Sequence, residues 1–153
     1  MKRKLQLKHL EEASQEVDRL LTEGYERMGN WSLGQICLHM RLTMESNMRG
    51  YPTWMVVLGF PLRPILKWFA LPMILSGKSP NGIKTAPMFV PPNDVNDAEE
   101  VERFKSCVQE FLASDSPLHA HPGFGMMTKE GFNAFHAAHA AHHLSFLRST
   151  GDE

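Results

Sequence analysis

The stretch from Phe135 to Phe146, FHAAHAAHHLSF, constrains the fold of this chain more than any other. It holds four histidines in twelve residues and no Asp, Glu, Lys or Arg. At about 100° per residue, these histidines share one arc of roughly 140° with the neighbouring phenylalanines. Alanines fill much of the opposite side. Because such a phenylalanine face must be covered, we predict a helix with several imidazoles on its buried side.

Three more stretches have apolar residues three and four positions apart, the spacing of amphipathic helices. Ser32 and Gln35 form a capping-box pair at the start of the second helix, and Gly50 is a stop signal after it. Asn96 or Asp97 can cap the third helix, and Thr128 can cap the fourth. We expect no strand, and helices at about 7–21, 33–48, 98–114 and 129–148.

The connection between the second and third helices is long and unusual. Residues 54–75 are very apolar, whereas residues 76–95 are rich in Pro, Gly and Asn. A transmembrane helix needs about 18 or more apolar residues with few charges, and this stretch is interrupted by Gly59, Pro61, Arg63, Pro64, Lys67 and Pro72. We therefore predict one or two short helices packed on the other helices, followed by an ordered loop.

These elements predict an all-α fold: a four-helix bundle with a long crossover between helices 2 and 3. A connection of that length can return the chain to the starting end of the bundle, so the second and third helices could run parallel. At 153 residues the chain suits a single domain spanning positions 1–153.

Composition sets the broad class of protein. The chain has 16 Lys and Arg against 17 Asp and Glu, a formal net charge of −1, which argues against a nucleic-acid partner because phosphate binding needs a basic face. The start, MKRKLQLKHL, has no apolar core segment and no cleavage site, so we expect no signal peptide. Cys37 and Cys107 are far apart, which indicates free thiols in a reducing cytoplasm.

The histidines suggest a metal site. His139 and His143 lie four residues apart, so both can reach one ion from the same helix face. The pairs His136/His139 and His139/His142 are three apart and remain alternatives. A further alternative is a set of core histidines that hydrogen bond to protein groups without any metal.

A third ligand must come from another element. His39, midway along the second helix, is the candidate, although it sits at the flank of that helix's apolar stripe and could be half-exposed. Three protein ligands leave a coordination position open, which is typical of a catalytic site. Zn is the default metal, while Ni or Fe also accept imidazole. His142 could act as a catalytic base or could simply be hydrogen bonded.

Three segments, NWSLGQICLHM, HPGFGMMTKEGF and HAAHHLSFL, together resemble the DinB/YfiT-like family of metalloenzymes. They occur in the expected order and cover about a third of the chain. The resemblance implies a four-helix bundle with a crossover, frequent homodimers, and a metal held by His39, His139 and His143. Members of the family include thiol-dependent S-transferases and isomerases, hydrolase-like proteins and DNA-damage-inducible proteins.

Three functional hypotheses follow. The first is a metal-dependent hydrolase or thiol-dependent S-transferase that acts on a small-molecule substrate of unknown identity. The second is a non-enzymatic bundle that dimerises, or docks on a membrane or partner, through residues 54–75, whose Trp, Phe, Arg and Lys content is that of an interfacial segment. A bundle that binds metal without turnover is a third, weaker hypothesis.

Overall fold

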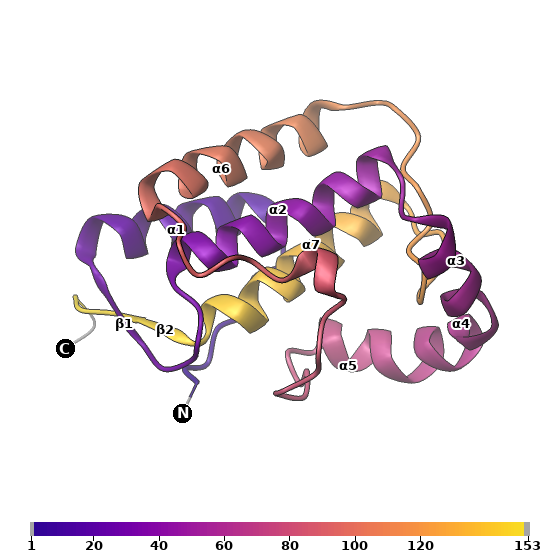
Figure 1. Ribbon diagram of the computed structural model, residues 1–153, viewed down its shortest axis with the longest axis horizontal. Helices are drawn as coiled ribbons and strands as arrows, with labels where there is room; N and C mark the ends of the chain where they lie inside the picture. The colour runs from indigo at the N-terminus through magenta and orange to yellow at the C-terminus, as the bar shows by residue number, and fades with distance from the viewer. Residues whose placement is uncertain (1, 152–153) are drawn as a thin grey trace.

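The computed structural model describes residues 2–151 and is mostly helical (Figure 1). Four helices of 14–17 residues pack together, and a further helical segment, which contains prolines, lies to one side of them. A two-stranded antiparallel sheet pairs residues 25–27 with residues 147–149, next to the C-terminus. The long helices and strands are α1 (Leu10–Glu23), β1 (Tyr25–Arg27), α2 (Leu33–Arg49), α6 (Asp97–Ala113), α7 (Lys129–Leu144) and β2 (Leu147–Ser149).

Helices α2 and α6 run side by side in the same direction. At their starts, the Gly34 amide donates to Asp97 Oδ1 at 2.7 Å. At their ends, Arg49 Nη2 lies 2.9 Å from Glu110 Oε1. The predicted parallel arrangement of these two helices is therefore confirmed, and the connection between them returns the chain to the end at which α2 begins.

The predicted caps begin three of the four long helices. Ser32 Oγ accepts from the Gln35 amide at 3.2 Å, and Gln35 Oε1 accepts from the Ser32 amide at 2.9 Å, which completes the capping box. Asn96 and Thr128 each accept at 3.0 Å from the amide three residues on. Helix α1 begins at Leu10, three residues later than predicted, and its N-cap residue His9 makes no side-chain cap hydrogen bond.

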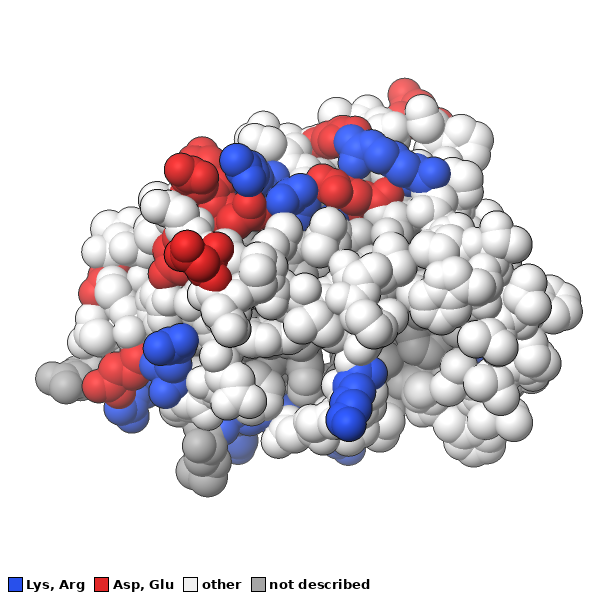
Figure 2. Space-filling view, in the orientation of Figure 1, with Lys and Arg blue, Asp and Glu red and all other residues white. Residues whose placement is uncertain are grey.

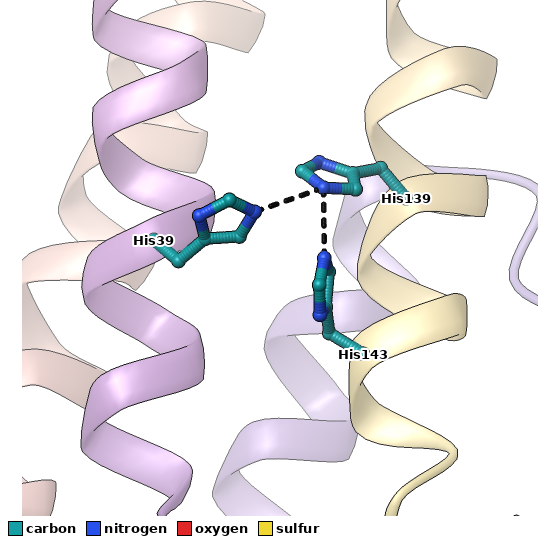
Figure 3. A group of neighbouring side chains, drawn as sticks. All are labelled: His39, His139 and His143. Atoms are coloured by element: carbon teal, nitrogen blue, oxygen red, sulfur yellow. Dashed lines mark hydrogen bonds between the residues drawn. The ribbon is translucent and has the colours of Figure 1, made fainter. Parts of the chain in front are cut away.

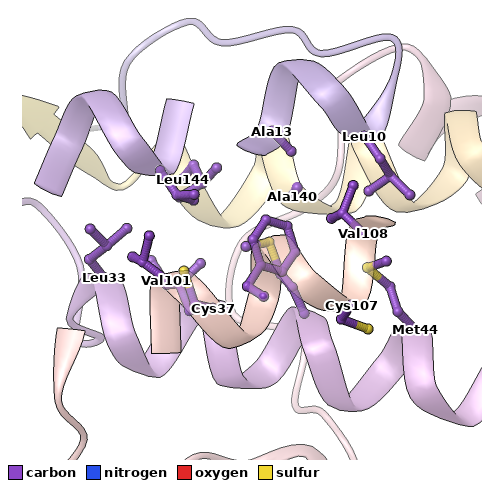
Figure 4. Close-up of a cluster of buried hydrophobic side chains, with 14 of the residues drawn as sticks. Leu10, Ala13, Leu33, Cys37, Met44, Val101, Cys107, Val108, Ala140 and Leu144 are labelled. Atoms are coloured by element: carbon purple, nitrogen blue, oxygen red, sulfur yellow. The ribbon is translucent and has the colours of Figure 1, made fainter. Parts of the chain in front are cut away.

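One apolar core joins the four long helices (Figure 4). Each helix contributes fully buried side chains, such as Leu10 of α1, Leu33 of α2, Phe104 of α6 and Leu144 of α7. Both cysteines, Cys37 and Cys107, are buried free thiols in this core. Burial of apolar area supplies the main stabilisation here, and the inward stripes are those that the spacing of apolar residues predicted.

The prediction that residues 54–75 are helical is confirmed, but the expectation of one or two short helices packed on the others is wrong, because the helical run is continuous and mostly exposed. From Thr53 to Leu75 the chain is helical throughout, although its hydrogen-bonding pattern changes repeatedly around the prolines. Leu71 packs with Phe124 and Phe135 in a second, small apolar cluster that holds the segment against α7. The elements of the crossover are α3 (Thr53–Gly59), η1 (Phe60–Leu62), α4 (Arg63–Ile65), η2 (Leu66–Ala70), α5 (Leu71–Leu75) and η3 (Pro87–Phe89).

Two predictions about the end of the chain were wrong. Helix α7 ends at Leu144 rather than near position 148, and the next residues form a strand, where none was expected. Leu147 pairs with Arg27 and Ser149 with Tyr25. The spacing of apolar residues led to this error, because Leu147 fits the apolar stripe of a longer helix. In the structure, Leu147 is buried as part of strand β2 instead. Strands of three residues are also too short to show a period of two.

Candidate metal centre

Two helices bring the predicted ligands together (Figure 3). His39 projects from the buried side of α2 with 2% of its surface exposed, so it is not the half-exposed residue of the alternative interpretation. His139 and His143 project from successive turns of α7, where their spacing of four residues aligns them. All three rings point toward one another between the helices.

The three Nε2 atoms converge on one place. His39 Nε2 lies 3.1 Å from His139 Nε2, and His143 Nε2 lies 3.0 Å from the same atom. One ligand atom from each of the three residues lies within 4.8 Å of the others. Nitrogens bound tetrahedrally at about 2.0–2.1 Å from a zinc ion are roughly 3.3 Å apart. The spacing therefore fits a shared divalent metal ion after small adjustments.

Hydrogen bonding among neutral rings cannot account for both contacts. His39 Nδ1 lies 2.8 Å from the Phe89 carbonyl oxygen, so Nδ1 carries the proton and His39 Nε2 is a bare acceptor. If His139 Nε2 is protonated, its single proton can point along only one of its two contacts. If His139 Nε2 is bare, it faces the lone pair of His39. A cation at the centre removes this conflict, because each lone pair then has a partner.

Burial keeps these rings neutral. It lowers the pKa of His39, opposed in part by the Phe89 carbonyl. Burial also holds the pKa of His139 and His143 well below the usual value, and the neighbouring imidazoles lower both further. Neutral imidazole is the form that binds metal, so the three residues offer free lone pairs at neutral pH.

The surroundings orient two of the ligands. The Phe89 carbonyl comes from η3 in the crossover, and its contact fixes the tautomer and the ring plane of His39, as outer contacts do in known metal sites. Trp31 stacks on His143, with ring centroids 5.4 Å apart, and lies 5.0 Å from His39. Neither contact was predicted from the sequence, because both depend on segments far from the ligands along the chain.

A cleft of about 970 Å³ adjoins the three histidines, between α7 and the crossover segment. Its lining includes all three ligands, together with His142, Tyr51 and Lys84. Most of the other lining residues are apolar, among them Ile74 and Phe146. Ligand sites in proteins commonly have this size and apolar character, so the cluster is accessible to a small molecule.

His142 stands beside the cluster without belonging to it. Its ring centroid lies 5.0 Å from that of His143, and both rings line the cleft. Its Nδ1 is buried, and no residue in the described part of the chain hydrogen bonds to it. Burial lowers the pKa of His142, with a further contribution from Lys2. A neutral ring that lines the cleft is what a base at this position would need.

His136 is not part of the cluster, so the His136/His139 alternative is wrong. Its Nε2 lies 3.0 Å from Asn47 Oδ1, and the Asn47 side-chain amide donates to the His119 carbonyl oxygen at 2.7 Å. Burial lowers the pKa of His136 to about 3. His136 is therefore a core histidine, as in the alternative interpretation. Its Nδ1, however, is buried and has no hydrogen-bond partner among residues 2–151.

His121 lies in a tight turn formed by the HPGFG segment. Its Nδ1 accepts from the amides of Gly123 and Phe124, both at 3.1 Å, which places the ring proton on Nε2. Burial, assisted by Arg63, lowers its pKa to about 4. The ring lines the cleft beside Tyr51, with centroids 5.7 Å apart. His121 therefore provides a neutral N–H group on the cleft wall.

Fold and site together define a mostly helical protein with a three-histidine cluster that could bind a divalent metal ion. The chain belongs to the family described as protein of unknown function (DUF1569), whose profile matches residues 1–150. No curated protein and no solved structure matches the chain.

Proposed function

We propose that this protein is a metal-dependent enzyme, either a hydrolase or a thiol-dependent S-transferase, with a DinB/YfiT-like four-helix bundle. The observation that carries the proposal is the convergence of three neutral Nε2 atoms beside a cleft. His39, His139 and His143 would hold the ion, with Zn as the first candidate and Ni or Fe as alternatives.

The ligand set favours catalysis over a structural role. Structural zinc sites are usually closed by four protein ligands, whereas catalytic sites keep a position for water or substrate. Three histidines form this cluster in the described residues, and the cleft reaches them. When bound, the ion would supply Lewis acidity for activating water or for stabilising a thiolate.

Side chains around the cleft could supply the remaining chemistry. His142 lines the cleft and is the candidate catalytic base, with Nε2 as the proton acceptor because its Nδ1 is buried. His121 can donate from Nε2 to a carbonyl or anionic oxygen of the substrate. Trp31 excludes water from one side of His143 through its stacking contact. The apolar lining favours a small-molecule substrate with an apolar portion.

Elemental analysis of the purified protein tests the metal proposal. We expect about one equivalent of a divalent transition metal in the native protein and in His9→Ala, because His9 is exposed and outside the cluster. We expect a large loss in His139→Ala. A native protein without metal, or a His139→Ala variant that retains it, would contradict the proposal.

The reaction class needs a second measurement on the metal-loaded protein. A hydrolase should cleave ester or amide test substrates, with activity that falls in His142→Gln while metal content is unchanged. A thiol transferase should bind a low-molecular-weight thiol, which cobalt substitution would reveal as a thiolate charge-transfer band. Metal content without either response would favour the hypothesis of a bundle that binds metal without turnover.

The family resemblance also leads us to propose a homodimer located in the cytoplasm. Sedimentation equilibrium across a range of protein concentrations tests the dimer.

The non-enzymatic docking hypothesis is compatible with a metal site, because different residues of the same segment would serve the two roles. Met73 and Ile74 line the cleft, while their neighbour Leu75 is 47% exposed. Histidine variants that lose metal should therefore leave any docking through residues 54–75 unchanged.

A further inference from the structure

The crossover segment exposes many large apolar side chains. Trp68 and Phe69 are 78% and 76% exposed, the highest values among the exposed large hydrophobic residues. In Figure 2, the surface over α3, α4 and α5 is almost free of charged side chains, while acidic and basic groups gather together over α6. We call this surface the α3–α5 face; it consists of Val57, Leu58, Phe60, Leu62, Ile65, Trp68, Phe69 and Leu75.

The face remains exposed because the opposite side of the segment already meets the protein. Leu66, Ala70, Leu71 and Ile74 recur at helical spacing and pack in the small apolar cluster against α7. Residues between them, such as Trp68 and Phe69, must then point outward. A helix that is apolar on every side is normally buried, so the outer side of this segment lacks its partner.

Charge is distributed unevenly around this face. Residues 46–93 contain five Lys and Arg and no Asp or Glu, although the whole chain has a net charge of −1. The remainder of the chain has eleven basic against seventeen acidic residues. Lys67, Lys78 and Lys84 are all exposed. Apolar aromatic groups beside exposed lysines, without acids, complement an anionic lipid surface.

We propose that the α3–α5 face docks this protein on an anionic membrane surface, with the segment lying in the plane of the interface. Trp68 and Phe69 enter the boundary between headgroups and acyl chains, where aromatic side chains concentrate. Lys67 and Lys78 contact anionic headgroups. The proposal does not depend on the metal site and holds whether or not the protein is an enzyme.

The structure favours lying on the membrane over crossing it. By length and composition alone, Thr53–Leu75 could span a bilayer. However, Arg63 Nε donates to the Pro122 carbonyl oxygen at 3.0 Å, and a Cβ on Gly59 would stand 2.4 Å from that same oxygen. Leu71 is also buried against the rest of the protein. A spanning helix would lose all these contacts.

Charge also favours lipid over a second copy of the chain. A two-fold interface places the same patch of both subunits together. Here that would bring together two copies of a patch that contains Lys67, with no acidic residue between positions 46 and 93 to offset its charge. An anionic bilayer supplies the missing negative charge.

Vesicle flotation of the full-length protein tests the proposal. We expect it to float with phosphatidylcholine vesicles containing 30% phosphatidylserine, and much less with phosphatidylcholine alone or at high salt. Lys67→Glu should weaken partitioning by about tenfold or more, since each basic residue near an anionic surface contributes about fivefold. The double variant Trp68→Ser/Phe69→Ser should weaken it at least as much.

Two controls separate docking through this face from a general charge effect and from misfolding. Arg27→Glu makes the same charge change on β1, at the end of the molecule opposite α3–α5, and should partition like the wild type. Circular dichroism should show that the variants keep their helical content. Equal flotation of Lys67→Glu and wild type, or flotation on neutral vesicles alone, would refute the proposal. So would a dimer in lipid-free solution that becomes a monomer in Trp68→Ser/Phe69→Ser, because a second copy would then cover the face.

Discussion

The replacement His139→Ala should remove most of the stabilisation of this protein by divalent metal ions. His139 is the shared member of the cluster, because its Nε2 makes both of the short contacts, to His39 at 3.1 Å and to His143 at 3.0 Å. Without it, two nitrogens from different helices remain. We expect metal affinity to fall by at least the 10–100-fold that the loss of an outer contact costs in known sites.

The magnitude follows from linkage. A metal ion present at 100 times its Kd stabilises the folded protein by about 2.7 kcal/mol. For 153 residues, an unfolding entropy of about 2.1 cal/mol/K per residue converts this to a rise in Tm of about 8 °C. If affinity falls 100-fold, the same concentration gives about 0.4 kcal/mol, or roughly 1 °C.

Differential scanning fluorimetry of chelator-treated protein, titrated with Zn²⁺, measures this difference. His9→Ala is the matched control, since it removes an exposed imidazole whose side chain caps nothing. It should retain the full rise in Tm. An equal rise in His139→Ala and wild type would show that the ion binds elsewhere and would refute the reasoning from convergent lone pairs.

Three further predictions concern stability. Acid should destabilise the metal-free protein between pH about 6.5 and about 3, because burial lowers the pKa of His136 to about 3 in the folded protein, while in the unfolded chain it is near 6.5. The free energy of unfolding should therefore fall by about 1.4 kcal/mol per pH unit in this range. In urea unfolding, the free energy of unfolding of His136→Gln should depend less steeply on pH. In a denaturant titration, Glu100→Gln should lower the free energy of unfolding by about 1–3 kcal/mol, because this 5% exposed carboxylate is the acceptor for two arginines. The control Glu102→Gln, at a side chain that is 70% exposed, should change it by less than about 0.5 kcal/mol. Gly34→Ala should destabilise by about 1–3 kcal/mol in thermal melts, since its Cβ would stand 2.8 Å from Asp97 Oδ1 and 3.0 Å from Asp97 Cα, and an unchanged Tm would contradict this close approach of α2 and α6.

Local signals account for what could be predicted of the fold. The Ser32 and Gln35 box, the Asn96 cap and the Thr128 cap act within three residues of each helix start, so the sequence displays them directly. The end of α7 was misplaced because pairing of Leu147 with Arg27 competes with helix continuation across 120 positions of sequence. No local pattern reports such a pairing.

The candidate site divides in the same way. The alignment of His139 and His143 follows from one helix and could be predicted from their spacing. His39 was proposed from its motif, but its 2% exposure and its direction depend on how α2 packs against α7. The Phe89 carbonyl carried no signal at all, because every residue has a carbonyl group and only the path of the crossover selects this one.

By itself, the sequence determined which segments are helical, where three of them begin, and which two histidines share a turn of α7, because these depend on interactions over three or four residues. Only the tertiary structure decided which imidazole from another helix joins them. It also decided that His136 turns to Asn47 and that one side of α3–α5 stays uncovered. These outcomes depend on contacts between segments 50 to 120 positions apart, whose choice reflects how all the helices bury their apolar faces together.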